Sequence, residues 1–178
     1  PSTWRPAAAG GWGGGLGGGV CVAAALVVGA LRVVLTEPAL VRSAVMAPTV
    51  RPGDHAVSTT VDIGGDASMR GALVTFRRPA SGVLTLKRIA GVGGYLIAIR
   101  DGVLYVNGRR HVEPSVDART VDSVYFGPVR VPHGTVFVLG DNRADSEDSR
   151  TFGPVPTVDL VGRVLVRVWP LGDAGLLR

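Results

Sequence analysis

The stretch YLIAIRDGVLYVNGRRHVE, residues 95–113, decides the fold class of this chain. Three short runs, the first two rich in Val, Ile and Leu, are separated by two dipeptides, Asp101-Gly102 and Asn107-Gly108. Such dipeptides supply the positive φ angles that two-residue turns require, so they are strong signals for β-hairpins. The stretch therefore predicts three antiparallel strands joined by two tight turns.

Similar short runs, broken by Gly and Pro, continue on both sides of this stretch. They predict strands at Ala72–Phe76, Val83–Ala90, Val136–Leu139 and Leu160–Trp169. After residue 40 no segment has the apolar spacing typical of a helix, and no internal repeat occurs. Residues 36–178 are therefore predicted to form one mainly β domain of curled antiparallel sheets.

An uncharged segment precedes this domain. No charged residue occurs from Pro6 to Leu31, and the apolar run LGGGVCVAAALVVGALRVVL covers residues 16–35. A helix of that length spans about 30 Å, the thickness of the hydrocarbon core of a bilayer. We therefore expect an N-terminal tail at residues 1–15 and one transmembrane helix at residues 16–35, with membrane lipid as a partner. A cleaved signal peptide is the alternative, although its basic n-region is weak here and the run is long.

Composition narrows the classes of partner and cofactor. The net charge is +5, and the 18 arginines are scattered along the chain. This pattern predicts no nucleic-acid partner and some attraction to anionic lipid. The single cysteine, Cys21, excludes an intramolecular disulfide and a cysteine-based zinc site, and the three histidines lack metal-ligand spacing. We expect neither a metal nor a cofactor.

The only lysine, Lys87, lies within one of the predicted strands. A buried lysine can lose its proton near neutral pH, whereas an arginine cannot. Alternation along the strand places Lys87 on the same face as Val83, Thr85 and Ile89, where an ammonium group is poorly solvated. Lys87 is therefore a candidate general base, the alternative being an exposed lysine at the sheet edge.

A polar loop, GDNRADSEDSR at residues 140–150, follows the strand expected at Val136–Leu139. Opposite charges such as Asp148 and Arg150 can pair and make the loop rigid. The spacing of its acidic residues does not match a calcium-binding EF-hand. On composition alone it is an ordinary solvated loop.

Three ordered boxes occur along this chain. They are RSAVMAPTVRPGD (residues 42–54), LKRIAGVGGY (residues 86–95) and the polar loop at residues 140–150, followed by FGPV. Together they resemble the boxes of the bacterial type I signal peptidases, in which the first has the form Pro-Ser-Gly-Ser-Met-x-Pro-Thr-Leu followed by Gly-Asp. The resemblance implies a signal peptidase fold: curled antiparallel sheets with one N-terminal transmembrane helix.

The resemblance also implies an activity and a location. The family is one of serine endopeptidases, hydrolases that use a serine–lysine dyad to cleave signal peptides from exported preproteins during protein secretion. The implied place is the cell membrane, with a single-pass anchor and the β domain on the extracytoplasmic side. Signal peptides of exported preproteins are the implied partners.

Roles follow from the resemblance position by position. They are Lys87 as general base, Ser43 as the hydroxyl that helps to hold the oxyanion beside the backbone N–H of residue 45, Ser146 as the residue that orients Lys87, Asp148 and Arg150 as structural residues near the site, and Met46, Val50, Thr85 and Leu86 as residues of the substrate groove.

One departure bears on the chemistry. Val45 occupies the position of the nucleophilic serine, and Met46, Pro48 and Thr49 fix this register without a gap. Valine has no hydroxyl and cannot attack a carbonyl, so we expect the standard catalysis to be impaired.

Three interpretations of this departure are open. The chain is a non-catalytic, signal-peptide-binding paralogue (a pseudoenzyme), or an active peptidase with a relocated nucleophile, Ser43 or Thr49. The third is that valine stands where the working gene encodes serine. In the second box Gly93 and Tyr95 also replace the usual Pro and Asp, which alters the turn after the catalytic strand.

Overall fold

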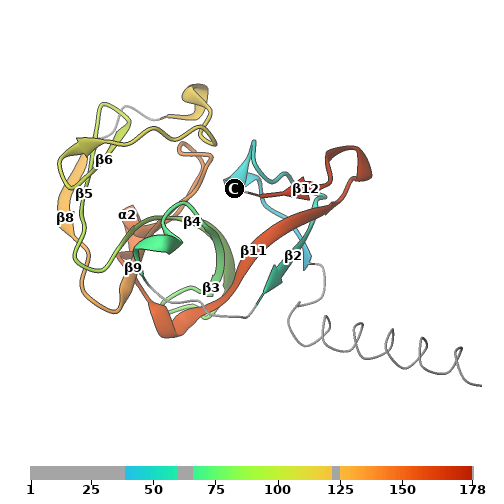
Figure 1. Ribbon diagram of the computed structural model, residues 1–178, viewed down its shortest axis with the longest axis horizontal. Helices are drawn as coiled ribbons and strands as arrows, with labels where there is room; N and C mark the ends of the chain where they lie inside the picture. The colour runs from blue at the N-terminus through green and yellow to red at the C-terminus, as the bar shows by residue number, and fades with distance from the viewer. Residues whose placement is uncertain (1–38, 60–65, 122–124, 178) are drawn as a thin grey trace, which may run out of the picture. The chain divides into compact units, whose positions relative to one another are not determined.

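The computed structural model describes residues 39–59, 66–121 and 125–177 (Figure 1). Their strands all pair antiparallel and form two sheets. The strands are β1 (Ala39–Leu40), β2 (His55–Thr59), β3 (Leu73–Arg77), β4 (Leu84–Val92), β5 (Leu96–Arg100), β6 (Val103–Val106), β7 (Arg109–Arg110), β8 (Phe126–Arg130), β9 (Thr135–Leu139), β10 (Val155–Pro156), β11 (Leu160–Trp169) and β12 (Gly175–Leu176). The mainly β fold class is therefore confirmed.

The two tight turns expected from the sequence are present. Asp101 and Gly102 have φ angles of 50° and 73°, and Asn107 and Gly108 have 52° and 77°. Two consecutive positive φ angles are the geometry of a type I′ turn, which matches the twist of the strands it joins. The turns connect β5 to β6 and β6 to β7, and β8 completes this four-stranded sheet on the other side of β5.

The larger sheet has the order β1-β2-β11-β3-β4-β9-β10, with β12 paired to β11. β11, the long curved strand in Figure 1, pairs with β2 and with β3. β4 lies between β3 and β9, and this position carries Lys87. The strands expected at Ala72–Phe76, Val83–Ala90, Val136–Leu139 and Leu160–Trp169 are therefore confirmed within one or two residues, as β3, β4, β9 and β11.

Three apolar clusters form the core of the described residues, the first two mainly from strand residues. One contains Val74, Phe76, Ile89 and Val138, and the second contains Ile97, Leu104, Phe137 and Leu139. The third contains Met46, Val50, Ala56, Leu73 and Val164, and it lies beneath the first of the three sequence boxes.

Helices are short in the described part of the chain. They are α2 (Ser149–Phe152) and the 3₁₀ turns η1 (Ala44–Met46), η2 (Ala67–Met69), η3 (Ala118–Thr120), η4 (Thr157–Asp159) and η5 (Leu171–Asp173). None of the helices among the described residues has the length and hydropathy needed to cross a bilayer. The expected tail at residues 1–15 and transmembrane helix at residues 16–35 lie outside the described residues.

Candidate active site

Lys87 is a buried residue in the middle of β4, with only 1% of its surface exposed. Its Nζ donates a hydrogen bond to Ser146 Oγ at 2.7 Å. The Ser146 hydroxyl in turn donates to Asp148 Oδ2 at 3.0 Å. The interpretation of Lys87 as an exposed lysine at the sheet edge is therefore wrong, and Ser146 is positioned to orient its amine.

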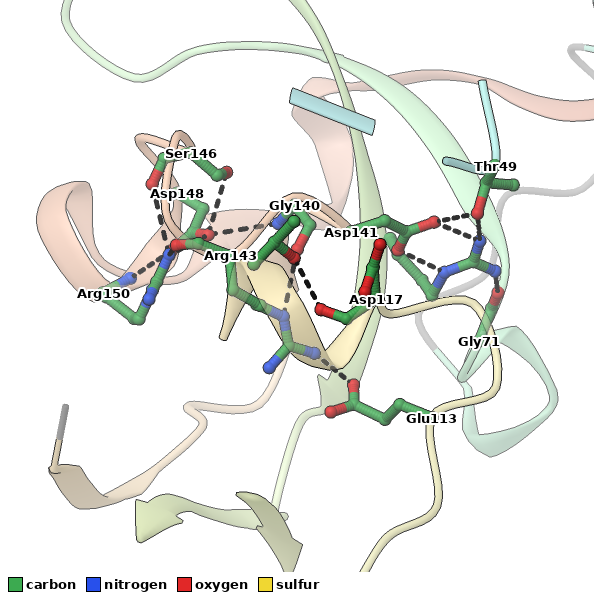
Figure 2. Close-up of polar contacts among 12 residues, drawn as sticks. Thr49, Gly71, Glu113, Asp117, Gly140, Asp141, Arg143, Ser146, Asp148 and Arg150 are labelled. Carbon is green, nitrogen blue, oxygen red and sulfur yellow. Dashed lines mark hydrogen bonds and ion pairs between the residues drawn. The ribbon is translucent and has the colours of Figure 1, made fainter. Parts of the chain in front are cut away.

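Asp148 anchors the polar loop from a fully buried position (Figure 2). Its carboxylate pairs with Arg150 Nε at 2.9 Å and accepts a hydrogen bond from the Gly140 backbone N–H at 3.1 Å. Gly140 has no room for a side chain, because a Cβ there would overlap Ser146 Oγ. The loop that composition alone describes as solvated is thus a rigid support for Ser146.

The environment of Lys87 lowers the pKa of its amine to about 8. Burial is the largest cause, because it disfavours the charged ammonium, and the nearby charges of Arg78 and Arg150 act in the same direction. The negative charge of Asp148 raises the pKa and offsets part of this effect. An appreciable fraction of Lys87 is therefore neutral near pH 8 and able to accept a proton.

This titration is open to a direct measurement. Because Lys87 is the only lysine, selective ¹⁵N labelling gives one Nζ resonance, which we expect to titrate with a midpoint of about 8. Between pH 8 and 10.5 the unfolded chain holds a proton that the folded chain has lost, so the free energy of unfolding should rise with pH there. A midpoint near 10 would remove Lys87 as a base at neutral pH.

Ser43 and Val45 belong to the turn η1. Ser43 caps this turn, and its Oγ accepts a hydrogen bond from the Val45 N–H at 3.3 Å. The Val45 carbonyl accepts from the Asn142 N–H at 3.1 Å, which ties the turn to the polar loop. The hydroxyl and the N–H expected at the oxyanion position are therefore adjacent, and here they bond to each other.

Residues of the η1 turn and of β4 line one open cavity of about 450 Å³. Residues that share it include Ser43, Val45, Met46, Thr85, Leu86 and Lys87. Most of its surface is apolar, and Leu84 on one wall is 54% exposed. We call this cavity the groove.

Val50 is placed differently from the sequence-based expectation. Its side chain is fully buried beside Met46 and Leu73 in the third apolar cluster, and it is not among the residues that line the groove. Its assignment as a substrate contact is therefore corrected to a core residue. The strand pattern could not show this, because Val50 lies in the loop between η1 and β2.

A second buried ion pair, which the sequence did not reveal, lies next to the site (Figure 2). Arg88 donates to both carboxylate oxygens of Asp141, at 2.8 and 2.7 Å. Thr49 Oγ1 donates to the same carboxylate at 2.5 Å, and Arg88 Nη1 donates to the Gly71 carbonyl at 2.7 Å. This pair connects all three sequence boxes, because Thr49, Arg88 and Asp141 each belong to a different one.

Comparison with known proteins is consistent with this site. The family model described as "Signal peptidase, peptidase S26" matches residues 18–169, most of the chain. The chain belongs to the signal peptidase family.

Relatives within the signal peptidase family cover most of this chain. A probable signal peptidase I-2 of Synechocystis is 33% identical over 169 residues, which are 91% of this chain and 76% of that protein. Signal peptidase I T of Bacillus subtilis is 35% identical over 142 residues, 75% of this chain and 73% of that protein. A signal peptidase I crystal structure from Enterococcus faecalis is 32% identical, with a TM-score of 0.47, over 53% of this chain and 93% of that chain.

In this member of the signal peptidase family, Lys87 and Val45 line the same groove, but residue 45 has no hydroxyl. The Lys87 amine donates a hydrogen bond to Ser146, the Ser146 hydroxyl donates to Asp148, and Ser43 also lines the groove. Acyl transfer needs a nucleophile within about 3–3.5 Å of the carbonyl carbon, and the Val45 side chain supplies none.

Proposed function

We propose that this chain binds signal peptides of exported preproteins in the groove and cleaves them poorly, because Val45 replaces the attacking serine. The observation that carries the proposal is that Val45 and Lys87 line the same groove. Removing the nucleophilic serine of another serine protease lowers turnover by roughly 10⁶-fold. Binding is then the property of the groove that survives.

The edge of β4 supports an extended peptide as the ligand. Along Leu84–Lys87 this strand pairs with β3 on one side, while its pairing with β9 begins only at Arg88. Residues 84–87 also line the groove. An extended peptide can add to such an edge through its backbone, and small side chains at alternate positions fit a shallow apolar wall. A small-x-small segment meets both conditions.

The membrane location is part of the same proposal. The uncharged run from Pro6 to Leu31 supports a single-pass anchor. The resemblance to signal peptidases, which act on exported preproteins, favours the extracytoplasmic side for the β domain. Such an anchor would keep the chain in the membrane that exported preproteins cross.

Peptide binding tests the proposal directly. The full chain in neutral detergent should bind a fluorescent peptide carrying a small-x-small site, and mass spectrometry should find the peptide intact. Leu84→Glu should weaken binding about tenfold, since it places a charge on the apolar wall. Leu171→Glu is the matched control, because Leu171 is also exposed but lies outside the groove.

The outcomes separate the candidate functions. Equal affinity in the two variants would reject the groove as the binding site. Cleavage by the unaltered chain that disappears in Ser43→Ala would instead support Ser43 as a relocated nucleophile, a candidate favoured by its position on the groove.

A further inference from the structure

A second cavity, of about 560 Å³, lies at the four-stranded sheet. It is lined by Arg70, Tyr95, Val106, Asn107, Arg109, Arg110 and His111. None of these residues lines the groove, so the two cavities have separate walls. We call this cavity the basic pocket.

The basic pocket concentrates positive charge without a carboxylate among its lining residues. In the described part of the chain, Arg70, Arg109 and Arg110 form no ion pair. Some arginines elsewhere in the described residues are ion-paired, as Arg143 is with Glu113 and Arg167 with Asp54. Three guanidinium groups in a concave surface attract an anion more strongly than the same charges on a flat surface.

The hairpin fixes the backbone of two of these residues, Arg109 and Arg110. Arg109 and Arg110 form β7 directly after the tight turn at Asn107 and Gly108. The Asn107 side chain accepts a hydrogen bond from the Leu96 N–H at 2.8 Å, and the His111 N–H donates to the Leu104 carbonyl at 2.8 Å. The backbone on both sides of the two arginines is therefore anchored. An anchored backbone reduces the conformational entropy lost when a ligand binds, while the exposed arginine side chains are ordered by the ligand itself.

We propose that the basic pocket binds a phosphate group, from either an anionic lipid headgroup or free inorganic phosphate. Guanidinium groups donate paired hydrogen bonds that match the oxygens of phosphate, and several arginines together can surround one such group. The proposal is independent of the groove and of peptide cleavage.

Nuclear magnetic resonance of the full chain in neutral detergent tests this proposal. His111 lines the basic pocket, and a His111→Asn variant identifies its ring signal among the three histidines. The probes are inorganic phosphate in one titration and phosphatidylglycerol in mixed micelles in the other, both at constant pH and ionic strength. We expect a saturable shift of the His111 signal with at least one probe.

Charge-matched variants separate a site from general attraction. Arg109→Gln/Arg110→Gln should raise the dissociation constant at least tenfold. Arg77→Gln/Arg100→Gln removes the same charge from β3 and β5, outside the basic pocket, and should leave the constant within twofold. If the first variant fails to fold, Arg70→Gln tests the same site from outside the hairpin, because Arg70 follows η2.

The outcomes of the two titrations identify the source of the phosphate group or overturn the proposal. Saturation with phosphatidylglycerol alone identifies a lipid headgroup, and saturation with inorganic phosphate alone identifies the free anion. Saturation with both identifies a site that accepts phosphate in either form. No saturable shift with either probe, or equal weakening in the two charge-matched variants, overturns the proposal.

Discussion

Val45→Ser is expected to turn this chain into an active signal peptidase in detergent, with cleavage of a small-x-small preprotein at least 10³-fold faster than by the unaltered chain. The new hydroxyl would share the groove with Lys87, whose amine Ser146 already orients. Restoring a nucleophile next to its base recovers part of the roughly 10⁶-fold loss that follows removal of a catalytic serine. Serine is smaller than valine, so the loss of partly buried methyl groups should cost only about 1 kcal/mol of stability.

The pH dependence and two control variants identify the mechanism. The rate should rise with pH and level off above about 8, because Lys87 must be neutral to take the serine proton. Val45→Ala has the smaller side chain without a hydroxyl and should stay inactive. Val45→Ser/Lys87→Met keeps the hydroxyl, removes the base and should also stay inactive.

A folded but inactive Val45→Ser variant would contradict this expectation. The loss of function would then extend beyond one residue. The changes at Gly93 and Tyr95 in the second box would be the next to test. A Cβ on Gly93 would lie 2.9 Å from the His133 Cα, so restoring proline there requires the neighbouring chain to move.

Asp141→Asn is expected to lower the free energy of unfolding by about 3–5 kcal/mol. Asp141 is 1% exposed, and its carboxylate is the ion-pair partner of the buried Arg88 guanidinium. Removing the charge of Asp141 takes a buried counter-charge away from the Arg88 guanidinium, which costs far more than the loss of an exposed pair. Urea unfolding of the full chain in detergent, followed by tryptophan fluorescence, measures the change.

The control variants test whether burial is the reason. Asp173→Asn should change stability by less than about 0.5 kcal/mol, because Asp173 is exposed. Arg88→Met/Asp141→Leu should be less destabilising than Asp141→Asn, since it removes both charges of the pair from the interior. A loss below about 1 kcal/mol in Asp141→Asn would show that solvent reaches this pair.

Local sequence predicted much of the fold. The two hairpin turns were correct because positive φ angles depend on the residues of the turn itself, Asp101-Gly102 and Asn107-Gly108. The strands β3, β4, β9 and β11 followed from β-branched composition. The two-residue strands β1, β10 and β12 were missed, because two residues are too few to show an alternating pattern. The five-residue strands β2 and β8 were missed as well, and β8 contains a Gly-Pro pair that is unusual in a strand.

The candidate site depends both on the residue types in the sequence and on the tertiary structure. The sequence by itself determined which residue types are present: a single lysine, a serine at residue 146 in the polar loop, and a valine without a hydroxyl at residue 45. Only the tertiary structure decided that Lys87 is buried against Ser146, that Arg88 pairs with Asp141, and that Val50 belongs to the core. The first two contacts join segments more than fifty residues apart, and the burial of Val50 depends on packing around a loop. Sequence patterns could not predict them, because turn geometry and strand alternation reflect only a few neighbouring residues.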